Sequence, residues 1–274
     1  MQGVPELPEV ETISQGVRPV LVGQRIERVV VREPRLRWRV AEDLAPRLAG
    51  RTVRDVRRRA KYLIVDAGAE SLIAHLGMSG RLLVVEAGTP PAKHDHADVV
   101  LGSGLAVRLR DPRRFGSLHV ATAPDEHPLL AGLGPEPLGA WFDGAYLFAA
   151  SRRRTVAIKD LLLNSRIVAG IGNIYASEAL WAARVHPRTP AGRLGRVRLQ
   201  RVADAVRAIL QRAIDTGGTT LRDYRTPGGD PGLFAIELSA YGRAGLPCPR
   251  CGAAIRALRS GGRSTFYCPR CQRR

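Results

Sequence analysis

Two short cysteine motifs near the C-terminus, Cys248-Pro249-Arg250-Cys251 and Cys268-Pro269-Arg270-Cys271, decide how this part of the chain folds. Sixteen residues separate them, and they contain all four cysteines of the chain. This spacing is typical of a four-cysteine zinc site, in which four thiolates complete a tetrahedral shell and leave no open position. We therefore expect one structural Zn²⁺ held by Cys248, Cys251, Cys268 and Cys271. Two disulfides are the alternative, which a reducing cytoplasm disfavours.

The segment between the motifs predicts a β-hairpin over residues 255–267, because Gly261-Gly262 stands near its middle. Its tip carries Arg259 and Arg263, which place positive charge where a nucleic-acid groove could receive it. By itself the module indicates only a small zinc-stabilised hairpin.

The charge of the chain points to a polyanionic partner. Its 274 residues hold 43 Lys and Arg against 25 Asp and Glu, a formal net charge of +18. Nucleic acid is the commonest partner of so basic a protein. An acidic membrane is the alternative, disfavoured because no apolar run reaches the roughly 18 residues of a membrane span. The acidic N-terminus without an apolar core is unlike a secretory signal, so we expect a cytoplasmic protein.

Only three of the basic residues are lysines, Lys61, Lys93 and Lys159. A lysine side chain can be tuned to give up and take back a proton where an arginine cannot, so these lysines are candidates for chemistry. A basic residue on a basic surface is the plain alternative for each.

The hydrophobic pattern changes near the middle of the chain. An amphipathic helix at residues 10–21 precedes β-branched runs, which predict a sheet sandwich or barrel, at residues 25–31, 52–66, 71–85, 97–110 and 116–121. The Pro- and Gly-rich stretch at residues 133–139 is typical of a linker. Helical periodicity then predicts helices at residues 144–153, 156–164, 174–184 and 198–216, followed by a Gly-rich loop.

Several segments, in order from Pro5 to the C-terminus, resemble bacterial formamidopyrimidine-DNA glycosylases (the Fpg/Nei family). They are Pro5-Glu6-Leu7-Pro8-Glu9, Arg58-Arg59-Ala60-Lys61-Tyr62-Leu63, His75-Leu76-Gly77-Met78-Ser79-Gly80, Lys93-His94-Asp95-His96, Asp111-Pro112-Arg113-Arg114-Phe115-Gly116, Gly170-Ile171-Gly172-Asn173-Ile174-Tyr175-Ala176-Ser177-Glu178, Gly217-Gly218-Thr219-Thr220-Leu221 and the cysteine hairpin.

The resemblance implies an α+β fold with three domains. These would be a two-layer β-sandwich with the N-terminal proline helix at residues 5–133, a helical helix–two-turn–helix domain at 134–238, and a zinc finger at 239–274. It also implies a monomeric, nucleoid-associated enzyme acting on double-stranded DNA that contains oxidised bases. The implied activity removes oxidised purines such as 8-oxoguanine and formamidopyrimidines, and then nicks the strand by β,δ-elimination.

The resemblance assigns catalytic roles to Pro5, Glu6, Lys61 and Arg263. An N-terminal amine suits nucleophilic attack because its ordinary pKa of roughly 7.7–8.0 leaves an unprotonated fraction at neutral pH. In the chain as written, residues 1–4 make the Pro5 nitrogen a tertiary amide. We therefore expect translation to begin at Val4, whose codon would be GTG, with removal of that first residue.

The resemblance assigns DNA contacts to two groups of side chains. Met78, Arg113 and Phe115 would fill the space left by the flipped-out nucleotide, since a thioether and a ring can wedge between bases. Backbone phosphates would be bound by His94, Arg154, Lys159 and Asn173.

Asn173 is further expected to be the N-cap of the helix after it. His75 and His96 are expected to be structural histidines. A loop at residues 219–231, with Arg222 where relatives often have Lys, would cover the everted base.

Three alternatives remain open at this point. An enzyme of the same fold could prefer oxidised pyrimidines, and a protein that retains residues 1–4 could bind damage without catalysis. A general zinc-containing nucleic-acid binder would explain the charge and the cysteines but not Pro5-Glu6 or Lys61.

Overall fold

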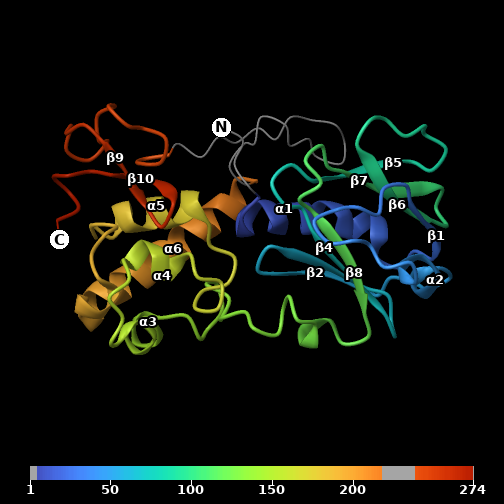
Figure 1. Ribbon diagram of the computed structural model, residues 1–274, viewed down its shortest axis with the longest axis horizontal. Coiled ribbons are helices and arrows are strands. Elements are labelled where there is room, and N and C mark those ends of the chain that lie inside the picture. The colour runs from blue at the N-terminus through green and yellow to red at the C-terminus, as the bar shows by residue number, and fades with distance from the viewer. Residues whose placement is uncertain (1–4, 218–237, 274) are drawn as a thin grey trace. The chain divides into compact units, whose positions relative to one another are not determined.

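The computed structural model describes residues 5–217 and 238–273. They divide into two compact units, residues 5–132 and residues 133–217 together with 238–273 (Figure 1). Each unit has a hydrophobic cluster of its own. No helix among these residues is long and apolar enough to cross a membrane.

The first unit begins with helix α1 (Leu7–Leu21), which starts three residues before the predicted position. Pro8 lies in the first turn, where a missing N–H costs nothing, and a capping box between Glu6 and Glu9 fixes the helix start. Val10, Ile13 and Val17 are buried along one face, as their spacing requires. Helix α1 packs against strands of both sheets described next.

Eight strands form two antiparallel four-stranded sheets with the orders β1-β6-β7-β5 and β2-β3-β4-β8. Side chains from both sheets and from α1 fill one core, and the predicted β-sandwich is confirmed. The strands are β1 (Ile26–Val31), β2 (Asp55–Arg59), β3 (Tyr62–Asp66), β4 (Ser71–His75), β5 (Arg81–Glu86), β6 (Asp95–Leu101), β7 (Leu105–Arg110) and β8 (Ser117–Ala121).

The predicted runs at residues 52–66, 71–85 and 97–110 are β, and each contains a turn and therefore two strands. The turn in the first run is Ala60-Lys61, which carries no Gly, Pro, Asn or Asp to mark it. Lys61 therefore lies at the tip of the β2–β3 hairpin and not within a strand. Helix α2 (Leu44–Leu48), packed on β1 and β8, was not predicted because five residues are too few for a periodic pattern.

The second unit contains the four predicted helices, with ends that differ by a few residues. They are α3 (Gly144–Ser151), α4 (Ile158–Leu162), α5 (Asn173–Ala182) and α6 (Arg196–Asp215); short 3-10 turns lie at Pro124–Glu126 in the first unit and Ala191–Arg193 in the second. Helix α6 packs against α3 and α5. The expectation that Asn173 is an N-cap was wrong: Gly172 has the capping backbone conformation, and Asn173 is the first helical residue.

The Pro- and Gly-rich stretch at residues 133–139 is not a free linker. The Gly134 N–H donates to the Ser165 carbonyl at 2.9 Å, and a Cβ at Gly134 would lie 2.6 Å from the backbone of Ile167. The stretch is packed into the second unit.

The predicted hairpin is confirmed as β9 (Arg256–Ser260) and β10 (Arg263–Tyr267). Gly261 and Gly262 form its two-residue turn with φ of 53° and 75°, the left-handed conformation that such turns need. Strand β10 packs on α5 (Figure 1).

Candidate functional site

The start of helix α1 holds Pro5 and Glu6, both of which are buried. The Glu9 carboxylate accepts the Glu6 backbone N–H at 2.9 Å, and the Glu6 side chain faces the Glu9 N–H in the other half of the capping box. The backbone that follows Pro5 is therefore fixed in position. A carboxyl group lies on the residue directly beside the proline.

Lys61 lies at the hairpin turn in which Ala60 adopts φ 53°, an uncommon conformation for a residue with a Cβ. The next residue, Tyr62, is paired in register with His75, and their rings are 4.8 Å apart. Burial, together with the positive charges of Lys61 and Arg37, lowers the pKa of His75 to about 4. At neutral pH the Lys61 ammonium thus has an uncharged imidazole near it.

Both histidines expected to be structural have that role. The Nδ1 of His75 accepts the Gly77 N–H at 3.0 Å, so this nitrogen is unprotonated. The Nε2 of His96 lies 2.8 Å from the Asp111 carbonyl. Each ring therefore supports a loop that carries predicted DNA contacts.

The loops of Met78 and of Arg113 and Phe115 are joined by the fully buried Asp111. Its Oδ1 accepts the Ser79 hydroxyl at 2.5 Å, and its Oδ2 accepts the Gly116 N–H at 2.8 Å. The Ser79 oxygen in turn accepts the Arg113 N–H at 3.1 Å. One carboxylate therefore fixes the ends of both loops.

The two loops also touch directly. Gly77 has φ 63°, and a Cβ there would lie 2.3 Å from the backbone of Phe115, so only glycine fits. The Phe115 ring is 40% exposed, with the Arg113 guanidinium 4.7 Å from its centroid. Met78 is half-buried. The structure thus gathers the three predicted wedge residues on one pair of loops.

His94 occupies a backbone corner with φ 74°. Its carbonyl accepts the Asp111 N–H at 3.0 Å. The loop before it is held by the buried Arg108, which donates to the carbonyls of Thr89 and Pro90 at 2.8 and 3.2 Å. His94 is therefore tied to the same aspartate as the wedge loops.

In the second unit, Lys159 and Asn173 meet the zinc hairpin. The Lys159 ammonium is fully buried and donates to Asn173 Oδ1 at 2.6 Å, to Thr265 Oγ1 at 2.8 Å and to the Ser264 carbonyl at 3.1 Å. The Asn173 amide also donates to the Ser264 carbonyl, at 3.0 Å. These bonds hold the start of α5 against β10, next to Arg263.

Asp160, the residue after Lys159, holds the other side of the hairpin tip. Its Oδ2 accepts the Ser260 hydroxyl at 3.0 Å, and a Cβ at Gly261 would lie 2.5 Å from its Oδ1. Lys159 and Asp160, consecutive residues of α4, therefore form hydrogen bonds with both strands of the hairpin. Arg263 and Arg154 have exposed side chains in this unit, the latter in the turn after α3.

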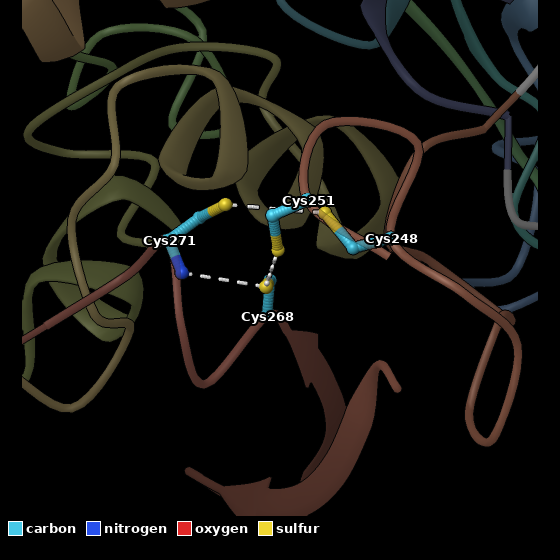
Figure 2. Close-up of side chains that lie close together, drawn as sticks. All are labelled: Cys248, Cys251, Cys268 and Cys271. Atoms are coloured by element: carbon cyan, nitrogen blue, oxygen red, sulfur yellow. Dashed lines mark hydrogen bonds between the residues drawn. The ribbon is translucent and has the colours of Figure 1, made fainter. Parts of the chain in front are cut away.

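The four cysteines form a metal site. Their sulfur atoms all lie within 4.8 Å of one another, and Figure 2 shows the side chains converging from the two motifs. The sulfurs of Cys251 and Cys268 are 3.5 Å apart, and those of Cys248 and Cys271 4.0 Å. Zn–S bonds of about 2.3 Å in a tetrahedron require similar separations, whereas a disulfide requires about 2.05 Å. The group fits one structural zinc.

Three family models match the chain in sequence order. They are the formamidopyrimidine-DNA glycosylase N-terminal domain at residues 4–118, the formamidopyrimidine-DNA glycosylase H2TH domain at residues 133–225, and a zinc finger found in FPG and IleRS at residues 245–274. The chain belongs to the formamidopyrimidine-DNA glycosylase family.

Named relatives match over nearly the full length. Formamidopyrimidine-DNA glycosylases of Pseudomonas aeruginosa (strain LESB58) and Ectopseudomonas mendocina are 53% and 54% identical over 270 residues, 98% of this chain and 100% of each relative. Among solved structures, the MutM (Fpg) protein from Thermus thermophilus is 41% identical with a TM-score of 0.86, covering 98% of both chains. Lactococcus lactis Fpg in complex with abasic-site DNA is 35% identical with a TM-score of 0.90, covering 98% of this chain and 100% of that one.

Three positioning residues of this formamidopyrimidine-DNA glycosylase family member were not predicted: Asp111, Asp160 and Glu178. The buried Glu178 accepts the backbone N–H groups of residues 239–241 at 2.7–2.9 Å, and burial raises its pKa. Asp111 and Glu178 lie in segments that carry the family resemblance, and Asp160 follows Lys159, which was the available signal. The roles predicted for the loop at residues 219–231 and for Arg222 lie outside the described residues.

Proposed function

We propose that this protein is a bifunctional DNA glycosylase and AP lyase that excises oxidised purines from double-stranded DNA. The observation that carries the proposal is the fixed start of α1, where Pro5 lies directly beside Glu6 in a chain whose full-length relatives are named formamidopyrimidine-DNA glycosylases. The solved Lactococcus lactis relatives bound to abasic-site and Fapy-dG DNA support DNA as the partner.

The proposed reaction starts at the amine of Pro5, which requires that residues 1–4 are absent from the working enzyme. The amine lone pair forms a bond to C1′ of the damaged nucleotide, the base leaves with the electrons of the glycosidic bond, and the proton on the Pro5 nitrogen moves to the departing base. Opening of the sugar ring breaks the C1′–O4′ bond and leaves an iminium between C1′ and the Pro5 nitrogen. Glu6 is the group that delivers the proton O4′ needs, because its carboxyl lies on the residue directly beside Pro5.

Strand cleavage follows from the iminium. It acidifies the C2′ proton, whose removal expels the 3′ phosphate; a second elimination then expels the 5′ phosphate. Lys61 assists the first elimination from its hairpin turn. Arg263 stabilises phosphate charge in the second, because a guanidinium does not readily give up a proton.

DNA binding is divided between the two units. Met78, Arg113 and Phe115 fill the space left by the flipped nucleotide, and His94 contacts the backbone. Asn173 and Arg154 bind backbone phosphates in the second unit. Because the Lys159 ammonium is enclosed by protein acceptors, it acts by positioning Asn173 and the hairpin.

The test is borohydride trapping on an 8-oxoguanine:C duplex with the protein expressed from its native gene, followed by mass spectrometry of the cross-linked peptide. An adduct on an N-terminal Pro5 is expected. Binding without an adduct would indicate a damage-binding protein, and an adduct on a lysine would overturn the mechanism. A parallel duplex with an oxidised pyrimidine should be processed more slowly; the reverse order would assign the alternative substrate class.

Lysine variants separate the two chemical steps. Lys61→Ala should slow strand nicking more than base release at saturating enzyme. Lys93→Ala, which removes the exposed lysine beside His94, is the matched control and should leave the ratio of the two rates unchanged.

A further inference from the structure

A strongly basic pocket lies at the zinc module, apart from the residues given catalytic or DNA-binding roles above. Its volume is about 580 Å³, and it is lined by two zinc ligands and five arginines: Cys251, Cys271, Arg184, Arg198, Arg250, Arg270 and Arg273. Arg184, Arg250, Arg270 and Arg273 are exposed, and Arg198 is half-buried.

Both cysteine motifs have the sequence Cys-Pro-Arg-Cys, so Arg250 and Arg270 occupy equivalent positions beside the metal. The Arg250 guanidinium lies 4.2 Å from the centre of the Trp181 ring and donates to the Trp181 carbonyl at 3.2 Å. It is therefore held in place before any ligand binds.

The C-terminal segment completes the pocket. Arg273 forms a parallel bridge with Val185, and the buried Gln272 donates to the Val185 carbonyl at 2.9 Å. This brings Arg273 beside the segment that contains Arg184. Arg198 of α6 donates to the Arg273 carbonyl at 3.4 Å.

The positive charge of the pocket is not neutralised within the part of the chain that the structure describes, where none of the five arginines has an ion pair. Zn²⁺ with four thiolates carries a charge of −2, so five guanidinium groups leave an excess of +3. Like charges held this close repel one another, which an anionic ligand would relieve.

The shape and lining of the pocket select the kind of anion. Single-stranded nucleic acid binds through aromatic rings on which bases stack, and the lining contains none; Arg250 covers the Trp181 ring. A duplex is too broad to enter a cavity of this volume and would reach only its exposed arginines, through backbone phosphates. A guanidinium group can donate two parallel hydrogen bonds to one carboxylate. An extended acidic peptide carries such carboxylates and is narrow enough to enter the pocket.

The pocket is separated from the Lys159–Asn173 cluster by the length of α5. That cluster lies at the start of the helix and Arg184 lies just past its end, and ten residues of helix span about 15 Å. A ligand in the pocket would leave Asn173 free to act.

We propose that this arginine pocket is a docking site for an acidic peptide segment of a partner protein. The proposal does not depend on the reaction proposed above. It gives the zinc module a second role, as the place where the enzyme is recruited by another protein.

Fluorescence anisotropy of the zinc-loaded full chain tests it, with a labelled ten-residue peptide of alternating Asp and Gly as the probe. Binding should weaken as salt rises. The double variant Arg198→Ala with Arg273→Ala lies outside both cysteine motifs and should weaken binding at least tenfold. Arg212→Ala, an exposed arginine on the same helix α6, is the matched control and should change it less than twofold.

Three results would overturn the proposal: no binding of the Asp peptide, equal binding of a peptide with Asn in place of Asp, or equal weakening by Arg212→Ala. Undamaged duplex DNA provides the remaining test. If the double variant lost duplex affinity as strongly as peptide affinity, the pocket would be a nucleic-acid contact. Zinc content and glycosylase activity should be unchanged in the double variant, which keeps this test separate from the proposed reaction.

Discussion

The two units use arginine in different ways. In the β-sandwich, arginines pair with carboxylates: Arg108 bonds Asp98 at 2.9 Å, and Arg47 bonds Glu70 at 2.7 Å. In the second unit, arginines donate to backbone carbonyls: Arg207 reaches Gly139 at 2.7 Å, and Arg188 reaches Arg259 at 2.6 Å.

A carbonyl satisfies the N–H groups of a guanidinium but leaves its charge in place. The first unit thus uses much of its positive charge in internal structure, whereas the second keeps its charge available for an anionic partner. This difference implies that the units should respond differently to loss of metal, to loss of a buried charge and to acid.

The largest expected effect is loss of the metal. Cys248 and Cys268 are themselves part of the hydrophobic cluster of the zinc module, and structural zinc contributes on the order of 10 kcal/mol to such modules. Chelation, or Cys268→Ser, should therefore unfold residues 239–273 and abolish DNA binding.

Hydrogen exchange measured by mass spectrometry checks this prediction. Exchange in β9 and β10 should rise to that of an unfolded chain, while strands β1–β8 keep their protection. Unchanged exchange in the hairpin would mean that the metal does not hold the module together.

The next effect concerns a buried ion pair of the β-sandwich. Burial alone would raise the pKa of Asp98, but hydrogen bonds from Arg32 and Arg108 lower it. Arg108→Ala would remove the buried guanidinium that Asp98 shares with Arg32, at a cost of about 3 kcal/mol in unfolding free energy, the lower end of the range for a broken buried pair. Arg35→Ala, which breaks an exposed pair with Glu33, should cost far less, because solvent screens an exposed pair. Urea denaturation measures both, and equal costs would contradict the distinction between them.

His75 should make the β-sandwich less stable in acid. Because burial and nearby positive charge lower its pKa to about 4, the unfolded chain binds a proton below the ordinary value of 6.5 while the folded chain does not. The unfolding free energy should therefore fall by as much as about 3 kcal/mol between pH 6.5 and pH 4, and this loss should level off below pH 4. His75→Gln should flatten this part of the profile. An identical slope in the variant would assign the effect to other groups.

The smallest expected effect is on DNA binding by the second unit, where it distinguishes a residue that positions others, Lys159, from one that contacts phosphate directly, Arg154. Lys159→Met should weaken DNA binding about tenfold without changing the slope of log K against log salt, since a buried ammonium releases no counterion. Arg154→Ala, at an exposed side chain, should reduce the magnitude of that slope by about 0.9. A similar change of slope in Lys159→Met would show that this lysine contacts phosphate.

The sequence by itself determined the features that depend on short-range spacing. The cysteine motifs predicted the zinc ligands, Gly261-Gly262 predicted the hairpin turn, and apolar periodicity located the helices. Motifs in order along the chain predicted the family. Each of these signals lies within a few residues, because metal knuckles, tight turns and helix faces are local structures.

Only the tertiary structure decided which polar groups meet. Lys159 was expected to contact DNA, yet residues more than a hundred positions away in β10 enclose its ammonium. Asp111 joins loops that lie more than thirty residues apart; its own segment carries the family resemblance, but only the fold shows that its carboxylate reaches Ser79. The Ala60-Lys61 turn was missed for the related reason that strand pairing, and not a turn residue, fixes it. Burial and pairing of this kind depend on distant segments, so they are properties of the folded chain and cannot be derived from any single stretch of it.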